Sequence, residues 1–436
     1  MAMTNFSHYV AKARNTGIRL AAVMAAMALA FPAIGAEETD STNHKEYVEE
    51  IGYLQKAYSD AGDPRFMLTT KDNVLSVGFG ARIQCNAFYD FSGALGSHQF
   101  APSSISVPTD KTGHFDYTAA GTKLYAKARA QKGKFKVIAY IDFTCKENVE
   151  KNREDICLGK AYMSVNGLTI GKTYSYFMDL KAGPATVDLK GPNTQVSLTH
   201  TLIGYTYKFN PHWTLAAALE KPSKIVNDKT AEGIKQNYNK YPDVTFHLKY
   251  KGSHGHVQVA GLWENISYWL SHDGTGANAE EVSRRTSGYG IALSGEYKAL
   301  PNLSFSAQGV YGKGVANYIQ DLANSSLHLC SSGQIDKEGY VIFKSVPAFG
   351  AYVSATYSWT PSLMSNIIYG YCAIDRKDSY SYANDFAHSQ YFAANLFYYI
   401  TPYCFGGIEY NFGEKKIASG IKGHANRINL CAVYRF

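Results

Sequence analysis

The chain has 436 residues, of which 45% are hydrophobic, 18% are charged and 34 are tyrosine, and its formal net charge is +7. Beyond the N-terminal residues no stretch reaches the roughly 20 apolar residues that a transmembrane helix needs, which excludes a helical membrane protein. The aromatic content of 14% suits a β-barrel, because tyrosine and tryptophan favour the membrane–water boundary.

The N-terminus has the layout of a secretory signal peptide. Lys12, Arg14 and Arg19 precede the apolar run at 20–31, and small residues allow cleavage after Ala36. An uncleaved anchor is the alternative, but twelve apolar residues fall well short of a membrane span. We therefore assign 1–36 as a signal peptide, which leaves a mature chain with 40 basic and 36 acidic residues, a net charge of +4.

Residues 37–70 are predicted to form a short periplasmic helical segment. Tyr47, Ile51, Leu54, Tyr58 and Ala61 step by four, three, four and three, which is a heptad seam. The seam spans barely two heptads. It fits either a coiled coil that joins subunits or an amphipathic helix that lies on the barrel.

Residues 71–436 alternate between apolar and polar side chains with a period of two, the pattern of strands with one apolar face. In the first strand Leu75, Val77 and Phe79 share one face, and Ser76 and Arg82 lie on the other. The sixteen expected strands are 74–91, 122–131, 134–143, 156–166, 168–176, 195–209, 212–221, 241–250, 255–269, 287–298, 302–314, 347–359, 362–375, 388–400, 403–412 and 424–436.

Tight and longer connections alternate along these strands, which is typical of periplasmic turns and extracellular loops. The tight connections are 131–134, 166–167, 209–212, 250–255, 298–302, 359–362 and 400–402. The longer connections are 92–121, 144–155, 177–194, 222–240, 270–286, 315–346, 376–387 and 413–423. Aromatic residues shortly before proline in four tight turns (Phe209, Tyr297, Trp359 and Tyr399) are expected to form the periplasmic aromatic girdle.

The fold class is therefore all-β: a transmembrane antiparallel β-barrel of about 16 strands in the bacterial outer membrane. The chain ends on an alternating strand with Phe436, and a terminal aromatic residue there resembles the last strand of bacterial outer-membrane proteins. Sixteen strands enclose an aqueous channel. The sequence thus predicts a porin for small polar solutes.

Basic residues gather on the polar faces of the first three strands, which would form one wall of the pore. They are Arg82, Lys123, Lys127, Arg129 and Lys136. Rows of lysine and arginine favour anions, so we expect an anion-selective path. The alternative is ordinary lumen polarity, with nearby acids such as Asp142 neutralising the wall.

The third long loop is expected to fold inward and narrow the channel. It contains two Gly-Pro steps and carries the charged residues Asp179, Lys181, Asp188 and Lys190. Its moderate length and mixed charge fit a constriction better than the Ser/Asn-rich loop at 315–346.

The same stretch, GKTYSYFMD followed by GPNT, resembles the corresponding region of DcaP-like trimeric porins, as does the opening strand GFGARIQCNAFYDF. The resemblance implies a homotrimer in contact with outer-membrane lipids. It also implies uptake of small anionic solutes such as dicarboxylates along basic residues, with Arg82, Lys123, Lys127, Arg129 and Asp179 as the matching positions. At positions 174 and 176 this chain has tyrosine, where DcaP-like porins typically have Trp and Thr.

Catalytic signatures such as GxSxG or a P-loop do not occur, and we expect no enzyme activity, cofactor, metal site or nucleic-acid partner. Of the seven cysteines, Cys145 and Cys157 flank the second long loop, a placement that allows a disulfide in an oxidising compartment. Three alternatives stay open: an outer-membrane enzyme, a carbohydrate-selective porin with an aromatic slide, and a structural or adhesive barrel without transport.

Overall fold

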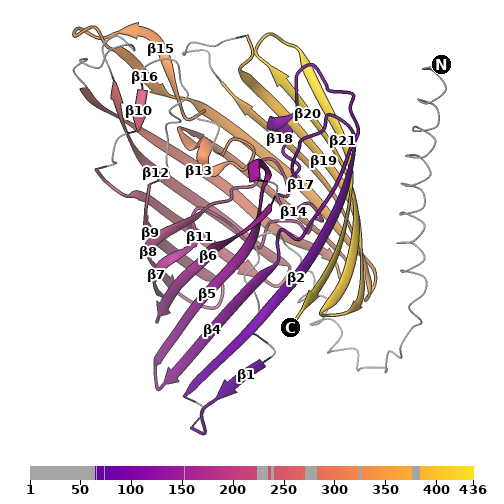
Figure 1. The fold of residues 1–436 in the computed structure, drawn as a ribbon. Coiled ribbons are helices and arrows are strands. Elements are labelled where there is room, and N and C mark those ends of the chain that lie inside the picture. The colour runs from indigo at the N-terminus through magenta and orange to yellow at the C-terminus, as the bar shows by residue number, and fades with distance from the viewer. Residues whose placement is uncertain are drawn as a thin grey trace, which may run out of the picture. The chain divides into compact units, whose positions relative to one another are not determined.

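The computed structural model describes residues 64, 66–72, 74–151, 153–222, 234–236, 240–270, 282–323, 327–375 and 383–436. The predicted signal peptide (1–36) and heptad seam (44–62) lie outside these residues. Within the described ranges, no helix is both long and apolar enough to cross a membrane. The fold is a β-barrel (Figure 1).

Sixteen antiparallel strands of the described chain form the closed wall, as the alternation predicted. Pairing between β2 and β21 closes it, and Figure 1 shows indigo β2 beside yellow β21. The wall strands are β2 (Leu75–Ser92), β4 (Lys123–Lys132), β5 (Phe135–Asn148), β6 (Arg153–Val165), β7 (Leu168–Tyr174), β8 (Thr199–Lys208), β9 (Trp213–Glu220), β11 (Asp243–Gly252), β12 (Gly255–Leu270), β13 (Val282–Leu300), β14 (Leu303–Lys313), β17 (Pro347–Thr360), β18 (Leu363–Ile374), β19 (Phe386–Thr401), β20 (Cys404–Ile417) and β21 (Lys422–Arg435).

Shorter elements add to the wall or lie in its loops. β1 (Phe66–Thr69) and β3 (His114–Thr118) pair with β2, and β10 (Ile234–Gln236) pairs with β12. β15 (Leu329–Ile335) and β16 (Val341–Ser345) form a separate hairpin. The 3-10 turns are η1 (Pro102–Ser104), η2 (Val149–Lys151) and η3 (Val315–Tyr318).

The two faces of the wall follow the sequence alternation. On β2, Phe79 and Ile83 are exposed, whereas Gln84 and Asn86 are buried. Exposed hydrophobic residues recur in this way on every wall strand, and they point to lipid rather than to water. The apolar face is therefore outside and the polar face inside.

β1 occupies a gap that β21 leaves at one end of the seam. β21 pairs with β2 only from Arg82 onward, and β1 pairs with the preceding part of β2, from Ser76 to Phe79. Unpaired backbone groups facing lipid would be costly, so β1 stabilises this edge. The sequence grouped residues 66–69 with the helical segment 37–70, and the structure corrects that assignment to a strand.

Three further details differ from expectation. The second long loop (144–155) is mostly strand, because β5 runs to Asn148 and β6 begins at Arg153. Cys145 and Cys157 are both free; Cys145 pairs with Ile156 and Cys157 with Thr144, so the two side chains point to opposite faces. Tyr399 points inward and is 4% exposed, so of the four aromatic residues expected in the girdle Phe209, Tyr297 and Trp359 are exposed and Tyr399 is not.

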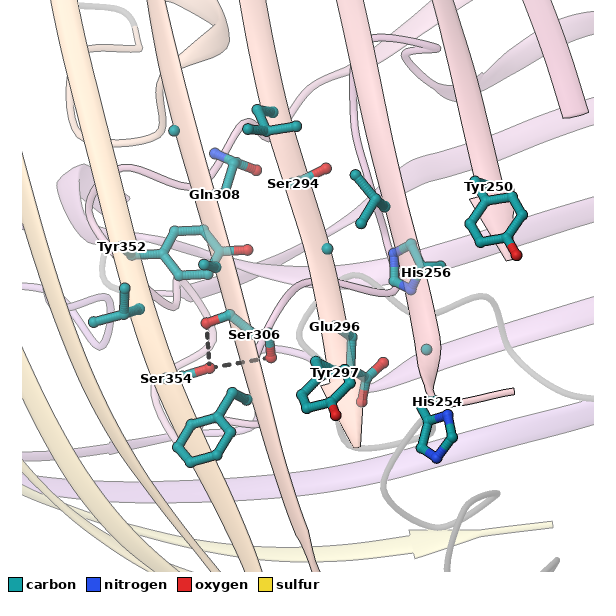
Figure 2. Close-up of a pocket in the computed structure, with 18 of the residues that line it drawn as sticks. Tyr250, His254, His256, Ser294, Glu296, Tyr297, Ser306, Gln308, Tyr352 and Ser354 are labelled. Atoms are coloured by element: carbon teal, nitrogen blue, oxygen red, sulfur yellow. Dashed lines mark hydrogen bonds between the residues drawn. The ribbon is translucent and has the colours of Figure 1, made fainter. Parts of the chain in front are cut away.

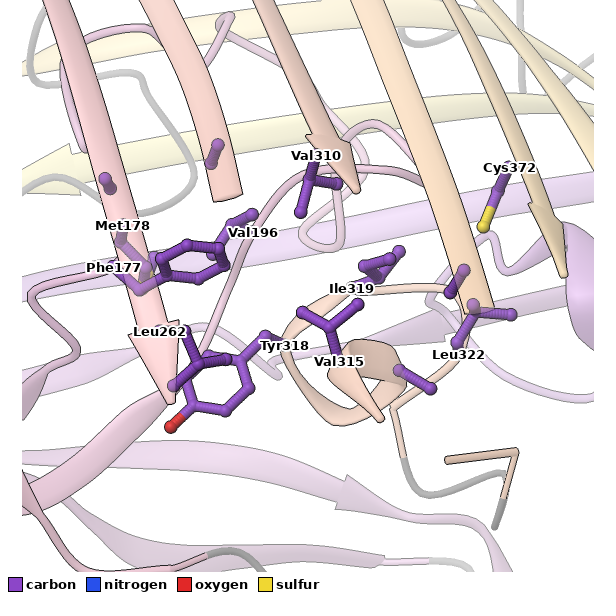
Figure 3. Packing of buried hydrophobic residues seen from close by; sticks show 14 of the residues in the cluster. Phe177, Met178, Val196, Leu262, Val310, Val315, Tyr318, Ile319, Leu322 and Cys372 are labelled. Atoms are coloured by element: carbon purple, nitrogen blue, oxygen red, sulfur yellow. The ribbon is translucent and has the colours of Figure 1, made fainter. Parts of the chain in front are cut away.

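Two loops meet inside the barrel. They are loop 3 (175–198) and loop 6 (314–346, apart from 324–326), and a bridge between Val196 and Ile319 joins them. Figure 3 shows Val315, Tyr318 and Ile319 of loop 6 in one buried cluster with Phe177 of loop 3, whose ring meets that of Tyr318 edge-on. The sequence favoured loop 3 alone as the inward loop; loop 6 also enters, because η3 is largely apolar and fully buried.

Candidate functional site

The predicted basic residues lie on the inner faces of β2, β4 and β5. Arg82, near the middle of β2, and Lys123, the first residue of β4, are cross-strand partners and are partly exposed. Lys127 is also partly exposed, and Arg129 and Lys136 are exposed toward the tight turn that joins β4 to β5. The register thus brings the five residues onto one continuous stretch of wall, which we call the basic wall.

Sequence reasoning missed two further cations of this region. Arg435 on β21 is the cross-strand partner of Arg82, and its guanidinium lies 5.3 Å from the centre of the Phe405 ring. Lys160 on β6 is buried and lies over the rings of Tyr140 and Tyr174. The period-two alternation, applied to β21, would have placed Arg435 inside. Applied to β6 from Ile156 and Leu158 it would have placed Lys160 outside, because a register shift at Gly159 turns Lys160 to the inner face.

Asp142 is the acid that sequence reasoning named as a neutralising partner. It is fully buried, and its carboxylate lies 3.4 Å from Lys123 Nζ and 3.9 Å from Lys160 Nζ. Lys123 is therefore partly compensated. Arg82 has no ion pair of this kind within the described residues, and its Nε is buried without a hydrogen-bond partner.

A row of tyrosines crosses the same wall. The rings of Tyr125, Tyr140 and Tyr162 on β4, β5 and β6 stack side by side, with centroid distances of 6.1 and 5.5 Å. Tyr125 lies over Gly80, where an added Cβ atom would overlap its ring. The wall thus combines cations with flat apolar surfaces.

Asp179 of loop 3 is bound to the far side of the barrel. Its carboxylate accepts hydrogen bonds from Lys249 Nζ (3.0 Å) and Ser294 Oγ (2.9 Å) and lies 2.7 Å from His256 Nε2. Burial disfavours the charge, but the bonds from His256 and Lys249 outweigh it and hold the pKa of Asp179 well below its usual value. In the strand order these partners, on β11–β13, lie about half-way round from β2.

Asp188 is buried against β20 and loop 1 (93–122). One carboxylate oxygen accepts the backbone N–H groups of Phe100 and Lys190, and the other is buried without a partner. Burial and the neighbouring Glu409 carboxylate raise the pKa of Asp188 to about 7. Of the other loop charges, Lys181 is exposed and Lys190 half-buried.

Inner-face side chains hold loop 3 along its length. Glu409 accepts the backbone N–H groups of Val187 and Asp188 at 2.9 and 3.0 Å. Asn395 donates to the Ala185 carbonyl, and Gln308 donates to that of Thr194. These contacts come from β14, β19 and β20, so the loop is fixed by side chains far from it in sequence.

Carboxylates also gather where loops 3 and 6 meet the wall. Glu220 accepts hydrogen bonds from Ser175 Oγ and the Tyr176 N–H, and Tyr318 donates to Asp243. Glu264 is buried beside them. Within the described residues no group of His, Cys, Asp or Glu side chains could hold a metal ion. The hydrogen bonds of this cluster anchor loops 3 and 6 to the wall.

A hollow of about 880 Å³ lies over β11–β14 and β17 (Figure 2). The exposed residues that line it, such as Val257, Leu293 and Val353, belong to the outward face. The polar residues beside them point inward and are buried, among them Ser306 and Ser354, which hydrogen-bond to each other. The hollow therefore opens on the lipid side and is separate from the lumen.

A closed sixteen-stranded barrel with an apolar outside, a charged inside and inward-folded loops is an outer-membrane channel of the porin class. A family model described as "DcaP outer membrane protein" matches residues 72–436. The chain belongs to the DcaP outer membrane protein family, and its location is the bacterial outer membrane.

Solved structures agree with this fold. The outer membrane channel DcaP of Acinetobacter baumannii is 20% identical with a TM-score of 0.68, covering 85% of this chain and 99% of its own. An anion-selective porin from Comamonas acidovorans is 9% identical with a TM-score of 0.54, covering 83% and 100%. OmpT of Vibrio cholerae is 10% identical with a TM-score of 0.51, covering 85% and 100%. Comparison with curated proteins gave no match.

Proposed function

We propose that this channel passes small polar solutes passively and prefers anions. The observation that carries the proposal is an imbalance of accessible charge. The five cations of the basic wall are at least partly exposed, whereas Asp179 and Asp188 of loop 3 are only 3% and 2% exposed. Their carboxylates are bound to other parts of the protein and are turned away from a passing solute.

The expected mechanism is electrostatic. A cation row against a low-dielectric wall raises the local concentration of anions and lowers that of cations. An anion that moves from Arg129 and Lys136, near the tight turn between β4 and β5, to Arg82 and Lys123, farther along the wall, exchanges water for charge-assisted hydrogen bonds at each step. Several moderate sites in series favour entry without trapping the solute.

We further propose that the solutes are dicarboxylate-like and that the protein is a homotrimer. Both points rest on the resemblance to DcaP-like trimeric porins. The porin from Comamonas acidovorans, which shares this fold, is anion-selective, and its selectivity is compatible with the proposed charge preference. Two carboxylates on a short solute would suit cations that recur along one wall.

Planar-bilayer recordings test the charge preference. Under a KCl gradient, the reversal potential of the wild type should indicate anion preference, and R82Q/K123Q/K127Q should shift it toward cations. The matched control K111Q/K132Q/K337Q removes the same charge from exposed positions outside the basic wall. It should leave the reversal potential nearly unchanged. Cation preference in the wild type would overturn the proposal, and absence of stepwise current would favour a barrel without transport.

A carbohydrate-selective channel is the second candidate, and the stacked tyrosines of β4–β6 favour it. Sugar rings stack on flat aromatic surfaces. If sugars are the solutes, maltose should block chloride current and Y125A/Y162A should abolish that block. Block by succinate but not by maltose would favour the anion channel.

Chemical crosslinking tests the trimer. A trimer joined by the N-terminal segment should crosslink to three chains in the full mature protein and lose this product when residues 37–62 are removed. Retention of the product would place the subunit contacts on the barrel. A monomer in both cases would contradict the trimer proposal.

A further inference from the structure

Asp142 of β5 is buried in the middle of the basic wall. Its neighbours in the same cross-strand row are Tyr125 on β4 and Lys160 on β6, and its side chain is 1% exposed. A buried carboxylate is stable only with close partners. The groups that bind the Asp142 carboxylate therefore determine how much of the positive charge of the basic wall it neutralises.

The hydrogen bonds of Asp142 are supplied mainly by groups other than Lys123. Oδ1 accepts the backbone N–H of Lys160 at 2.8 Å, and Oδ2 accepts the Tyr140 hydroxyl at 3.1 Å. A register shift between β5 and β6 accompanies this contact, and the lack of a Cβ atom on Gly159 leaves the space that Oδ1 occupies. The carboxylate is thus fixed in place.

Lys123 is held more loosely than these groups. Its Nζ lies 3.4 Å from Asp142, beyond the roughly 2.7–2.9 Å of a strong charge-assisted hydrogen bond. Its side chain is 20% exposed, whereas that of Lys160 is 3% exposed. Lys123 can therefore turn between the buried carboxylate and the lumen, while Lys160 cannot.

We propose that Asp142 is a built-in counter-ion that determines specificity by competing with passing anions for Lys123. This inference rests on the proposed anion preference. An anion in the lumen replaces Asp142 as the partner of Lys123. When the anion leaves, the ion pair between Lys123 and Asp142 forms again. Asp142 thereby limits how strongly the wall binds anions and speeds their release.

The decisive variant is D142N/K160Q, which removes one negative and one positive charge and leaves the net charge unchanged. The backbone bond from residue 160 and the Tyr140 bond remain possible. Without its competitor, Lys123 should raise the anion-to-cation permeability ratio about two- to fivefold and lower the concentration of succinate that half-blocks chloride current. The matched control R153Q/D155N removes an exposed ion pair from one end of the same strand, β6, and should change neither.

A second variant covers the case in which D142N/K160Q does not fold, which heat-dependent gel mobility would reveal. K123R keeps the charge, but a guanidinium can bind Asp142 with two parallel hydrogen bonds and should lower the permeability ratio. An unchanged or lower ratio in folded D142N/K160Q, or an unchanged or higher ratio in K123R, would overturn the role of Asp142. Lack of anion preference in the wild type would instead contradict the proposed function.

Discussion

Arg427 on β21 has no exposed surface and lies at the centre of a buried contact with β2. Its guanidinium donates two hydrogen bonds to Asp90, at 2.6 and 2.9 Å, and one to the His98 carbonyl. It also lies 4.0 Å from the centre of the Phe88 ring. One side chain therefore joins the first and last wall strands and fixes loop 1.

Arg427→Ala should destabilise the barrel strongly, because it leaves Asp90 buried and unpaired. We expect a loss of about 3–5 kcal/mol, measured by urea unfolding in detergent with tryptophan fluorescence. Arg153→Ala is the control, since its pair with Asp155 is exposed and should contribute less than about 1 kcal/mol. Equal losses would show that burial of the pair is unimportant.

At the scale of elements, loop 3 depends on a carboxyl whose charge changes near neutral pH. The raised pKa of Asp188, about 7, means that the folded protein holds this proton more tightly than the unfolded chain. Its contribution to stability is therefore complete below the ordinary carboxyl pKa and is lost as pH rises through about 7. Above that pH, Asp188 and Glu409 repel each other.

Hydrogen exchange of loop 3 checks this prediction. Backbone amides of 183–195 should exchange faster at pH 8 than at pH 6, after correction for the intrinsic rate. Asp188→Asn removes the titrating group and should flatten the difference. The same pH dependence in the variant would assign it to another group.

β1 offers a second test at this scale. Removing residues 37–62 should leave barrel stability unchanged, because β1 still pairs with β2. Removing 37–69 exposes the edge of β2 near Ser76 and should lower the temperature at which the barrel unfolds on semi-native gels. Equal unfolding temperatures would show that β1 does not stabilise the seam.

For the whole molecule, closure of the sheet separates an apolar outside from a charged inside, and the field of the basic wall acts across the lumen. Salt should weaken this field, since the Debye length falls from about 10 Å at 0.1 M to about 3 Å at 1 M. Anion preference measured at a fixed KCl ratio should therefore decline as the mean concentration rises. A preference independent of salt would contradict selection by a long-range field.

The period of two was enough to place the strands and their faces. Leu75 and Phe79 had to lie opposite Ser76 and Arg82, and only one face of a barrel strand is apolar. The same pattern placed Lys123 and Lys127 inside. Alternation also places Tyr399 inward, because Tyr398 and Ile400 beside it face outward. The expectation that Tyr399 joins the girdle rested instead on its position shortly before a proline.

The sequence by itself determined the barrel, its strand number and the inner position of the basic residues, because these depend on local alternation and loop length. Only the tertiary structure decided which charges remain accessible. Asp179 meets Lys249 and Asp142 meets Lys160 through strand register and loop packing, and contacts between residues distant in sequence leave no periodic signal. The balance between the basic wall and its buried acids is thus a property of the folded barrel.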